Sequence, residues 1–332
     1  MLQLLRKIAF PISLLYALVV HIRNFLFDMG IFSSKSYQTP TICIGNLSVG
    51  GTGKTPMTEY LLGMLKNKKT AVLSRGYKRK TKGFYLAGPK STVLDIGDEP
   101  FQIHKKFPEV AVAVDADRQN GIEQLESTIC PDVIVLDDAF QHRKVNPTVS
   151  ILLTTFDGLY VNDWYLPTGN LRDAKKEAKR ADVIIVTKCP MDMGDDDRKK
   201  TRAKLDPMPH QKVLFAVLRY MDFVCDGREV KIKLEALKGK ELALVTGIAS
   251  PGPLVQFLTS LGLNFVHFEF GDHHHFTDAE IARFKDYKTV LTTEKDFVRL
   301  QGRLDNLYFL GVAHSFGKND EEVLGDLVNG LF

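Results

Sequence analysis

The chain has 332 residues, enough for one large domain or two of medium size. Hydrophobic residues make up 44% of it and charged residues 25%, a composition that excludes a disordered chain. The net charge of +4 is too small to indicate nucleic-acid binding, but it suits a protein that approaches an anionic surface or substrate. The 4 cysteines are scattered without C-x-x-C spacing, which predicts reduced thiols in a cytoplasmic protein.

The first predicted element is an apolar segment at the N-terminus. Residues 8–20 carry no charge and are flanked by basic residues. The segment is shorter than the roughly 20 residues that span a bilayer. No small-residue cleavage pattern follows it, which argues against a signal peptide. A helix buried in the core and a helix lying in the membrane interface both remain open, and the basic flanks favour the interface.

Short β-rich runs alternate with helical stretches along the rest of the chain. Such runs are typical of buried parallel strands in an α/β sheet. Residues 213–232 predict two extended segments that turn at Asp226-Gly227, and a domain boundary is expected near them. The first series of predicted strands covers 41–45, 70–74, 110–114, 132–137, 149–153 and 182–187, and the second covers 242–246, 266–270, 289–292 and 307–310.

A glycine-rich loop between the first predicted strand and a helix is the strongest signal. Residues 41–55 read TICIGNLSVGGTGKT. Glycines let backbone N–H groups point at phosphate oxygens at the positive end of the helix. We expect Lys54 to reach the β- and γ-phosphates of ATP and the Thr55 hydroxyl to ligate Mg²⁺. The predicted nucleotide-binding residues are Ser48, Val49, Gly50, Gly51, Thr52, Gly53, Lys54 and Thr55.

This loop departs from the usual pattern at one position. A glycine normally stands six residues before the lysine, where this chain has Ser48. We expect Gly50 and Gly51 to supply the flexibility instead. The intact Gly-Lys-Thr ending still predicts a phosphate loop rather than a simple glycine-rich helix cap.

Two adjacent carboxylates close a later predicted strand. Residues 132–138 read DVIVLDD, so Asp137 ends the strand and Asp138 follows it. In a P-loop fold the Asp137 carboxylate would face the phosphate loop and hold Mg²⁺ directly or through water, and Asp138 would share the ion. Together with the loop, this pair predicts an enzyme that binds ATP and magnesium.

The phosphate loop and the paired carboxylates belong to a longer series of short motifs. These are GNLSVGGTGKTP (45–56), SRGY (74–77), GDEP (97–100), DR (117–118), DDAFQHR (137–143), LPTGNLR (166–172), TGI (246–248), DHH (272–274) and TTEKD (292–296). In sequence and order the series resembles the lipid A 4′-kinase (tetraacyldisaccharide 4′-kinase) family. Ala139 and Asp173 depart from the family, in which glycine and glutamate are usual at these positions.

The resemblance implies transfer of the γ-phosphate of ATP to the 4′-hydroxyl of a tetraacyl glucosamine disaccharide 1-phosphate, in lipopolysaccharide biosynthesis. It places this reaction at the cytoplasmic face of the bacterial inner membrane. It also implies a P-loop kinase-type α/β/α domain and a smaller α/β/α domain, joined by a two-stranded linker, with the active site in the cleft between them.

These expectations divide the chain into four parts. An N-terminal interfacial helical segment covers 1–37 and an ATP-binding kinase domain covers 38–212. The two-stranded linker covers 213–235, and a smaller C-terminal α/β domain covers 236–332. We expect a peripheral monomer that binds the acylated disaccharide and an anionic membrane surface, and that does not bind nucleic acid.

Individual roles also follow from the resemblance. It implies that Asp98 is the catalytic base and His273 its partner, with Lys54 as the third catalytic residue. The run GDHHHF at 271–276 also suggests zinc, but adjacent histidines cannot converge on one ion and no fourth ligand has recognisable spacing. The implied substrate-binding residues are Arg75, Tyr77, Arg118, Gln141 and Arg172.

Two other classes of P-loop protein share part of this pattern. In a GTPase, residues 184–188 (IIVTK) would precede a guanine-reading aspartate, but Pro190 stands at that position. A membrane-cycling switch ATPase often carries an additional lysine early in the loop, and residues 48–50 contain none. Turnover that requires a lipid-sugar acceptor would distinguish a kinase from such a switch.

Overall fold

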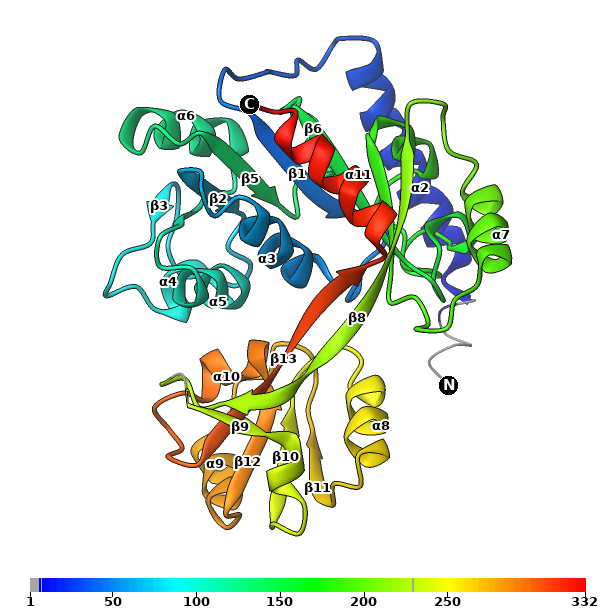
Figure 1. Cartoon of the computed structure of the whole chain (residues 1–332). Coiled ribbons are helices and arrows are strands. Elements are labelled where there is room, and N and C mark those ends of the chain that lie inside the picture. The colour runs from blue at the N-terminus through cyan, green and yellow to red at the C-terminus, as the bar shows by residue number, and fades with distance from the viewer. Residues whose placement is uncertain (1–5, 7, 229) are drawn as a thin grey trace.

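The computed structural model describes residue 6, residues 8–228 and residues 230–332 (Figure 1). The first part of the chain contributes a mainly parallel set of strands in the order β4-β2-β5-β1-β6-β7, with the short β3 antiparallel to β4. Their bounds are β1 (Thr41–Asn46), β2 (Thr70–Ser74), β3 (Tyr85–Leu86), β4 (Ala111–Val114), β5 (Val133–Asp137), β6 (Val149–Thr155) and β7 (Val183–Thr187).

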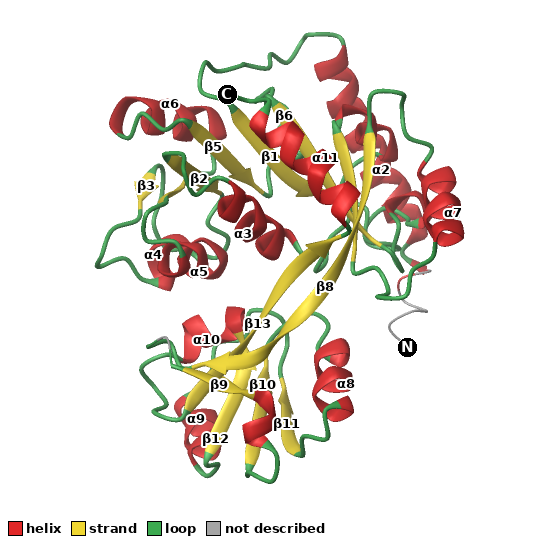
Figure 2. Cartoon of the chain, in the orientation of Figure 1, coloured by secondary structure: helices red, strands yellow, loops and turns green. Residues whose placement is uncertain are grey.

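The later part of the chain forms a second, smaller group of parallel strands in the order β11-β10-β12-β13. Two long strands connect it to the first group. These are β8 and β13, which pair antiparallel and run between the two lobes in Figure 2. The bounds are β8 (Lys212–Cys225), β9 (Lys231–Lys233), β10 (Leu242–Thr246), β11 (Phe265–Glu269), β12 (Thr289–Thr293) and β13 (Leu307–Phe316).

Helices cover both faces of the sheet. The bounds are α2 (Phe10–Asp28), α3 (Lys54–Met64), α4 (Val93–Ile96), α5 (Asp98–Lys106), α6 (Arg118–Thr128), α7 (Asp195–Leu205), α8 (Gly252–Ser260), α9 (Asp278–Lys285), α10 (Glu294–Leu300) and α11 (Lys318–Asn329), with short 3₁₀ turns at Tyr160–Asn162, Lys175–Arg180 and Leu234–Leu237. The predicted α/β fold is therefore confirmed, and the strands begin where predicted to within about one residue.

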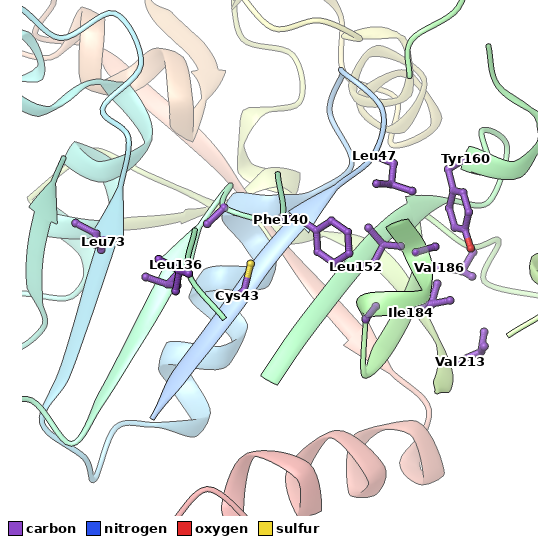
Figure 3. Close-up of a cluster of buried hydrophobic side chains, with 14 of the residues drawn as sticks. Cys43, Leu47, Leu73, Leu136, Phe140, Leu152, Tyr160, Ile184, Val186 and Val213 are labelled. Atoms are coloured by element: carbon purple, nitrogen blue, oxygen red, sulfur yellow. The ribbon is translucent and has the colours of Figure 1, made fainter. Parts of the chain in front are cut away.

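The core of the larger lobe lies on both faces of its sheet. Strands such as β1, β5 and β7 are buried along their whole length, as their continuous Val, Ile and Leu content predicts. One cluster includes Leu136, Phe140 and Leu152 (Figure 3). Burial of each such side chain contributes about 1.5–3 kcal/mol to folding. This packing sets the β1 and β5 ends, where the phosphate loop and the Asp137-Asp138 pair begin.

The connection between the lobes differs from the linker expected over 213–235. The segment 213–232 does turn back as β8 and β9, but the long partner of β8 is β13. β13 runs on to Phe316 because the backbone from Val312 to Phe316 pairs with β8. α11 then packs in the larger lobe, where Leu324 joins a cluster with Met57. The domain boundaries themselves remain predictions.

α2 attaches to the larger lobe through a narrow polar stripe. Ser13 Oγ donates to Thr168 Oγ1 at 2.8 Å, and Asn24 Nδ2 donates to Asp173 Oδ1 at 2.8 Å. Ser13, Val20 and Asn24 are its buried residues, so the helix is not a core helix. Its large apolar side chains face solvent: Phe10, Ile12, Leu14, Leu15, Leu18, Val19, Ile22 and Phe25.

α2 extends beyond the uncharged segment 8–20, because it continues through His21 and Arg23 to Asp28. Within the described part of the chain, it is the one helix whose length and mean hydropathy of 1.5 would be sufficient to cross a membrane.

Candidate active site

The phosphate loop leaves β1 and enters α3 at Gly53. Gly53 has a φ of +84°, in the left-handed region that favours glycine, and it caps α3. Thr52 fixes the loop from inside, because its hydroxyl accepts from Asn46 Nδ2 at 2.9 Å and its carbonyl accepts from Thr187 Oγ1 at 2.8 Å. The backbone therefore curls in front of the helix N-terminus, where it would present N–H groups to an anion.

Two residues of the predicted nucleotide-binding set bond to a neighbouring segment. The Ser48 hydroxyl donates to Asp163 Oδ2 at 3.0 Å, and the Val49 amide donates to the carbonyl of Asn170 at 2.8 Å. Gly50 and Gly51 form the exposed tip of the loop. Ser48 and Val49 thus anchor the loop to residues 163–171.

Lys54 and Arg172 both pair with Asp138. Lys54 Nζ lies 3.7 Å from Asp138 Oδ1, and Arg172 Nη1 donates to Asp138 Oδ2 at 3.1 Å. Burial raises the pKa of Asp138, but the charges of Lys54 and Arg172 outweigh burial and hold it below its ordinary value. Arg172 also donates a hydrogen bond to the side-chain oxygen of Asn46. Gln141 donates to the backbone carbonyl of Asn46. This network places two cations beside the phosphate loop.

Asp137 is buried at the end of β5 between two hydroxyl groups. Its carboxylate oxygens accept from Thr58 Oγ1 at 3.4 Å and Ser74 Oγ at 3.2 Å. Burial raises the pKa of Asp137 to about 7, although Lys54 and Arg118 act against it. A divalent cation would favour the ionised carboxylate, so Asp137 fits a magnesium ligand. No group of three or more His, Cys, Asp or Glu suited to a metal ion occurs among the described residues.

Arg118 lies inside the larger lobe. It is 1% exposed, and its guanidinium donates to the carbonyls of Asp115 and Asp137. These bonds support the end of β5. A role for Arg118 in substrate binding stays a prediction. Arg75 and Tyr77, by contrast, are exposed.

Asp98 and His273 meet across the two lobes. Asp98 begins α5 in the larger lobe, and His273 follows β11 in the smaller one. His273 Nδ1 lies 2.8 Å from Asp98 Oδ2, and the Tyr77 ring packs on the imidazole with centroids 5.3 Å apart. His273 has a φ of +59°, a backbone conformation uncommon outside glycine. The structure therefore brings the predicted base and its predicted partner into direct contact.

Lys295 determines which nitrogen of His273 carries the proton. Lys295 Nζ lies 3.1 Å from His273 Nε2 and 3.2 Å from Asp272 Oδ1. An ammonium can only donate, so Nε2 accepts and the hydrogen of a neutral imidazole sits on Nδ1. His273 therefore donates to the Asp98 carboxylate.

A cleft of about 530 Å³ lies between the lobes. The start of α3 lines one side with Thr55 and Pro56, and the start of α10 lines the other with Thr293 and Lys295. Lys188 also lines this cleft. Burial lowers the pKa of its ammonium group. Asp98 and His273 line a separate, much smaller pocket. Lys295 connects the two, because it lines the cleft and contacts His273.

A model of the tetraacyldisaccharide-1-P 4′-kinase family matches residues 5–329. The chain belongs to this family. It is 47% identical to the tetraacyldisaccharide 4′-kinase of Flavobacterium johnsoniae over 95% of this chain and 94% of that protein. It is 46% identical to the enzyme of the same name from Bacteroides thetaiotaomicron, over 89% of this chain and 83% of that one.

A solved structure of the family has the same fold. The "apo" form of LpxK from Aquifex aeolicus in complex with ATP superposes with a TM-score of 0.83, at 31% sequence identity and 99% coverage of each chain. The resemblance to the family and the P-loop kinase-type fold are therefore confirmed. The roles of individual site residues stay predictions.

Three site residues of this family member were not singled out from the sequence. Lys295 lies inside the TTEKD motif at 292–296. The motif contributed to the family resemblance but did not indicate what Lys295 does. Arg299 follows the motif and carries no local signature. His314, on β13, reaches the phosphate loop only because β13 passes beside it, with Nε2 3.0 Å from the Gly53 carbonyl.

Proposed function

We propose that this protein transfers the γ-phosphate of ATP to the 4′-hydroxyl of a tetraacyl glucosamine disaccharide 1-phosphate, which yields a bisphosphorylated lipid A precursor. The observation that carries this proposal is the contact between Asp98 of the larger lobe and His273 of the smaller lobe. The helix that follows the phosphate loop lines a neighbouring cleft, and Lys295 lines this cleft and contacts His273. The relatives named tetraacyldisaccharide 4′-kinase support this acceptor.

The chemistry assigned to the site is an in-line displacement. The acceptor oxygen forms a bond to the γ-phosphorus as the bond between that phosphorus and the β–γ bridging oxygen breaks, and ADP leaves with the electron pair. The hydroxyl proton passes to Asp98, which becomes neutral. Asp98 Oδ2 accepts from His273, and no described residue donates to Oδ1, so Oδ1 is available to take the proton. Such a base contributes about 10²–10⁴-fold to a rate.

Positive charge around the transferred group comes from the larger lobe. Lys54 and Arg172 lie beside the phosphate loop, where they would neutralise negative charge as it shifts during transfer. We assign Thr55, Asp137 and Asp138 to a magnesium ion, which would supply charge neutralisation at the phosphates. Asp138 would then exchange its contacts with Lys54 and Arg172 for the ion, which frees both cations for phosphate oxygens.

We further propose that α2 holds the enzyme on the cytoplasmic face of the inner membrane. The helix buries polar groups against the protein and exposes apolar side chains, the reverse of a helix that packs on a soluble core. Trp164 extends this surface, since its ring lies 5.6 Å from that of Phe10 and is itself exposed. A membrane interface is the environment in which such a surface is stable. The acyl chains of the acceptor lie in the same layer.

Product analysis tests the proposed reaction. The protein is incubated with ATP, Mg²⁺ and the tetraacyl disaccharide 1-phosphate in mixed micelles, and the lipid is analysed by mass spectrometry. A product heavier by one phosphate group, formed only with ATP and protein present, supports the proposal. An unchanged lipid under conditions in which the protein binds ATP would refute it.

A further inference from the structure

Arg299 is a buried cation beside the Asp98–His273 pair. It lies on α10 and its side chain is 5% exposed. Nη1 donates to the carbonyl of His274 at 2.7 Å, and Nη2 contacts the carbonyl of Gly247 at 3.3 Å. The third nitrogen, Nε, has no hydrogen-bond partner among the described residues and lies 3.6 Å from Asp98 Oδ2. A buried donor without a partner therefore faces the predicted base.

Asp296 fixes the position of Arg299. This carboxylate is fully buried and pairs with Arg299 Nη2. It also accepts from the Gly247 amide at 2.9 Å and from the Thr293 hydroxyl at 2.7 Å. Rotation of Arg299 away from this position would leave the buried Asp296 carboxylate without its cation, which is strongly unfavourable. The guanidinium is therefore held rigidly at the surface that the smaller lobe turns toward Asp98.

We propose that Arg299, held by Asp296, is a positioning residue that orients the Asp98 carboxylate for proton transfer when the two lobes approach. This inference rests on the proposed function. A charge-assisted N–H···O hydrogen bond spans about 2.8 Å, so an approach of roughly 0.8 Å completes the contact from Nε. Asp98 Oδ2 would then be held by His273 and Arg299 together, which leaves Oδ1 to face the acceptor hydroxyl.

Because charged groups surround Asp98, the role of Arg299 can be measured through the pKa of the Asp98 carboxyl. His273, Arg299 and Lys295 face it from the smaller lobe, and Lys295 is shared with Asp272 and Glu99. Burial raises the pKa of Asp98, but the hydrogen bond from His273 and the charge of Arg299 outweigh burial and hold the pKa below its ordinary value. Loss of Arg299 therefore raises the pKa of Asp98. Activity that needs the ionised carboxylate then begins to fall at a higher pH.

A purely structural role for Arg299 would have a different signature. If the residue only tied the carbonyls of His274 and Gly247 together, its loss would lower stability and leave the pH profile in place. Arg303 provides a matched control, because it also donates to a backbone carbonyl of this segment, that of Phe276 at 2.6 Å, and pairs with Asp278. No contact joins Arg303 to Asp98 within the described part of the chain.

The experiment compares Arg299→Met, Arg299→Lys and Arg303→Met with the unmodified full chain. We expect Arg299→Met to lower kcat by about 10- to 100-fold, with little change in KM for ATP. The acid limb of its pH–activity profile should move up by roughly 1 pH unit. Arg299→Lys should return this limb toward the position in the unmodified chain, and Arg303→Met should leave it unchanged. An unmoved acid limb in Arg299→Met would overturn the proposal.

A measurement without substrate separates this inference from the proposed function. The carboxyl of Asp98 is followed by ¹³C NMR in aspartate-labelled protein, and its signal is identified as the one lost in Asp98→Asn. Its titration midpoint should rise in Arg299→Met whether or not the disaccharide is the acceptor, and an unchanged midpoint would refute the role of Arg299. If Arg299→Met does not fold, Arg299→Gln removes the charge while keeping an amide donor, and the same shift is expected.

Discussion

His273 Nδ1 lies 2.8 Å from Asp98 Oδ2, although 175 residues separate the two in the chain. If the pair acts as a unit, Asp98→Ala and His273→Ala should each lower kcat by about 10²–10⁴-fold with little change in ATP affinity. The kcat of the double variant should be little lower than that of the less active single variant, because the first substitution already removes the joint contribution of the pair. Steady-state kinetics check this. His210→Ala, at an exposed histidine that lines neither pocket, serves as the control. Fully multiplicative losses would show that Asp98 and His273 act independently.

Lys54 should be essential for turnover. Its ammonium lies beside the phosphate loop and pairs with Asp138, so Lys54→Ala removes a charge that matters most as negative charge shifts during transfer. We expect kcat to fall by about 10²-fold or more, as measured by ADP release with saturating acceptor. Lys199→Ala, at an exposed position in α7, should behave as the unmodified protein. Near-normal turnover in Lys54→Ala would contradict the phosphate-loop assignment.

His314 should tie the inter-lobe strand β13 to the phosphate loop. Burial lowers the pKa of His314 to about 4, so the imidazole is neutral at pH 7 and Nε2–H donates to the Gly53 carbonyl. His314→Ala leaves that carbonyl unpaired, and loss of about 1 kcal/mol should raise the Kd for ATP roughly five-fold. Calorimetric titration measures it. His314→Gln, which keeps an amide donor, should bind ATP more tightly than His314→Ala, and equal affinities for the two would argue against the contact.

The same histidine predicts a pH dependence of stability. An unfolded histidine titrates near 6.5, and the folded group titrates near 4. The unfolded state therefore binds more protons between these values. Stability from this group is fully present above about pH 6.5 and is lost as the pH falls toward 4. Urea unfolding followed at several pH values should show a shallower decline for His314→Gln than for the unmodified chain, and equal slopes would refute the assignment.

The exposed apolar face of α2 should bind membranes. Leu14 and Leu18 are each 55% exposed, so Leu14→Glu with Leu18→Glu should weaken partition onto anionic vesicles while thermal stability stays nearly unchanged. Vesicle sedimentation measures the first quantity and thermal unfolding the second. Met191→Glu with Met208→Glu introduces the same charges at exposed apolar positions elsewhere and should not affect binding. Lost stability with intact vesicle binding would assign α2 to the core.

Local patterns predicted the parts of the fold that local physics determines. The apolar runs predicted buried strands such as β2 and β10, and the glycines before Lys54 predicted the phosphate loop. The continuation of β13 beyond Leu310 was not predicted, because it depends on pairing with β8, which is distant in the sequence. Likewise, the bonds from Arg118 to the carbonyls of Asp115 and Asp137 depend on tertiary packing, which no local pattern contains.

The same distinction between local patterns and tertiary packing applies to the residues of the candidate active site. The contact of Asp98 with His273 was expected from family motifs and not from spacing, since no local rule joins residues so far apart. Arg299 and His314 contact the site through the arrangement of the lobes, which no sequence window contains. Their roles emerge only when α10 and β13 are placed beside Asp98 and Gly53.

The position of the new phosphate group tests the central claim most directly. The lipid product is purified after incubation with ATP and Mg²⁺, and phosphorus–proton correlation NMR identifies the carbon that bears the added phosphate. We predict one phosphate added at the 4′ position for each ADP formed, and no ADP above background without the disaccharide. ATP hydrolysis at an equal rate without acceptor, or a phosphate at another position, would contradict a 4′-kinase.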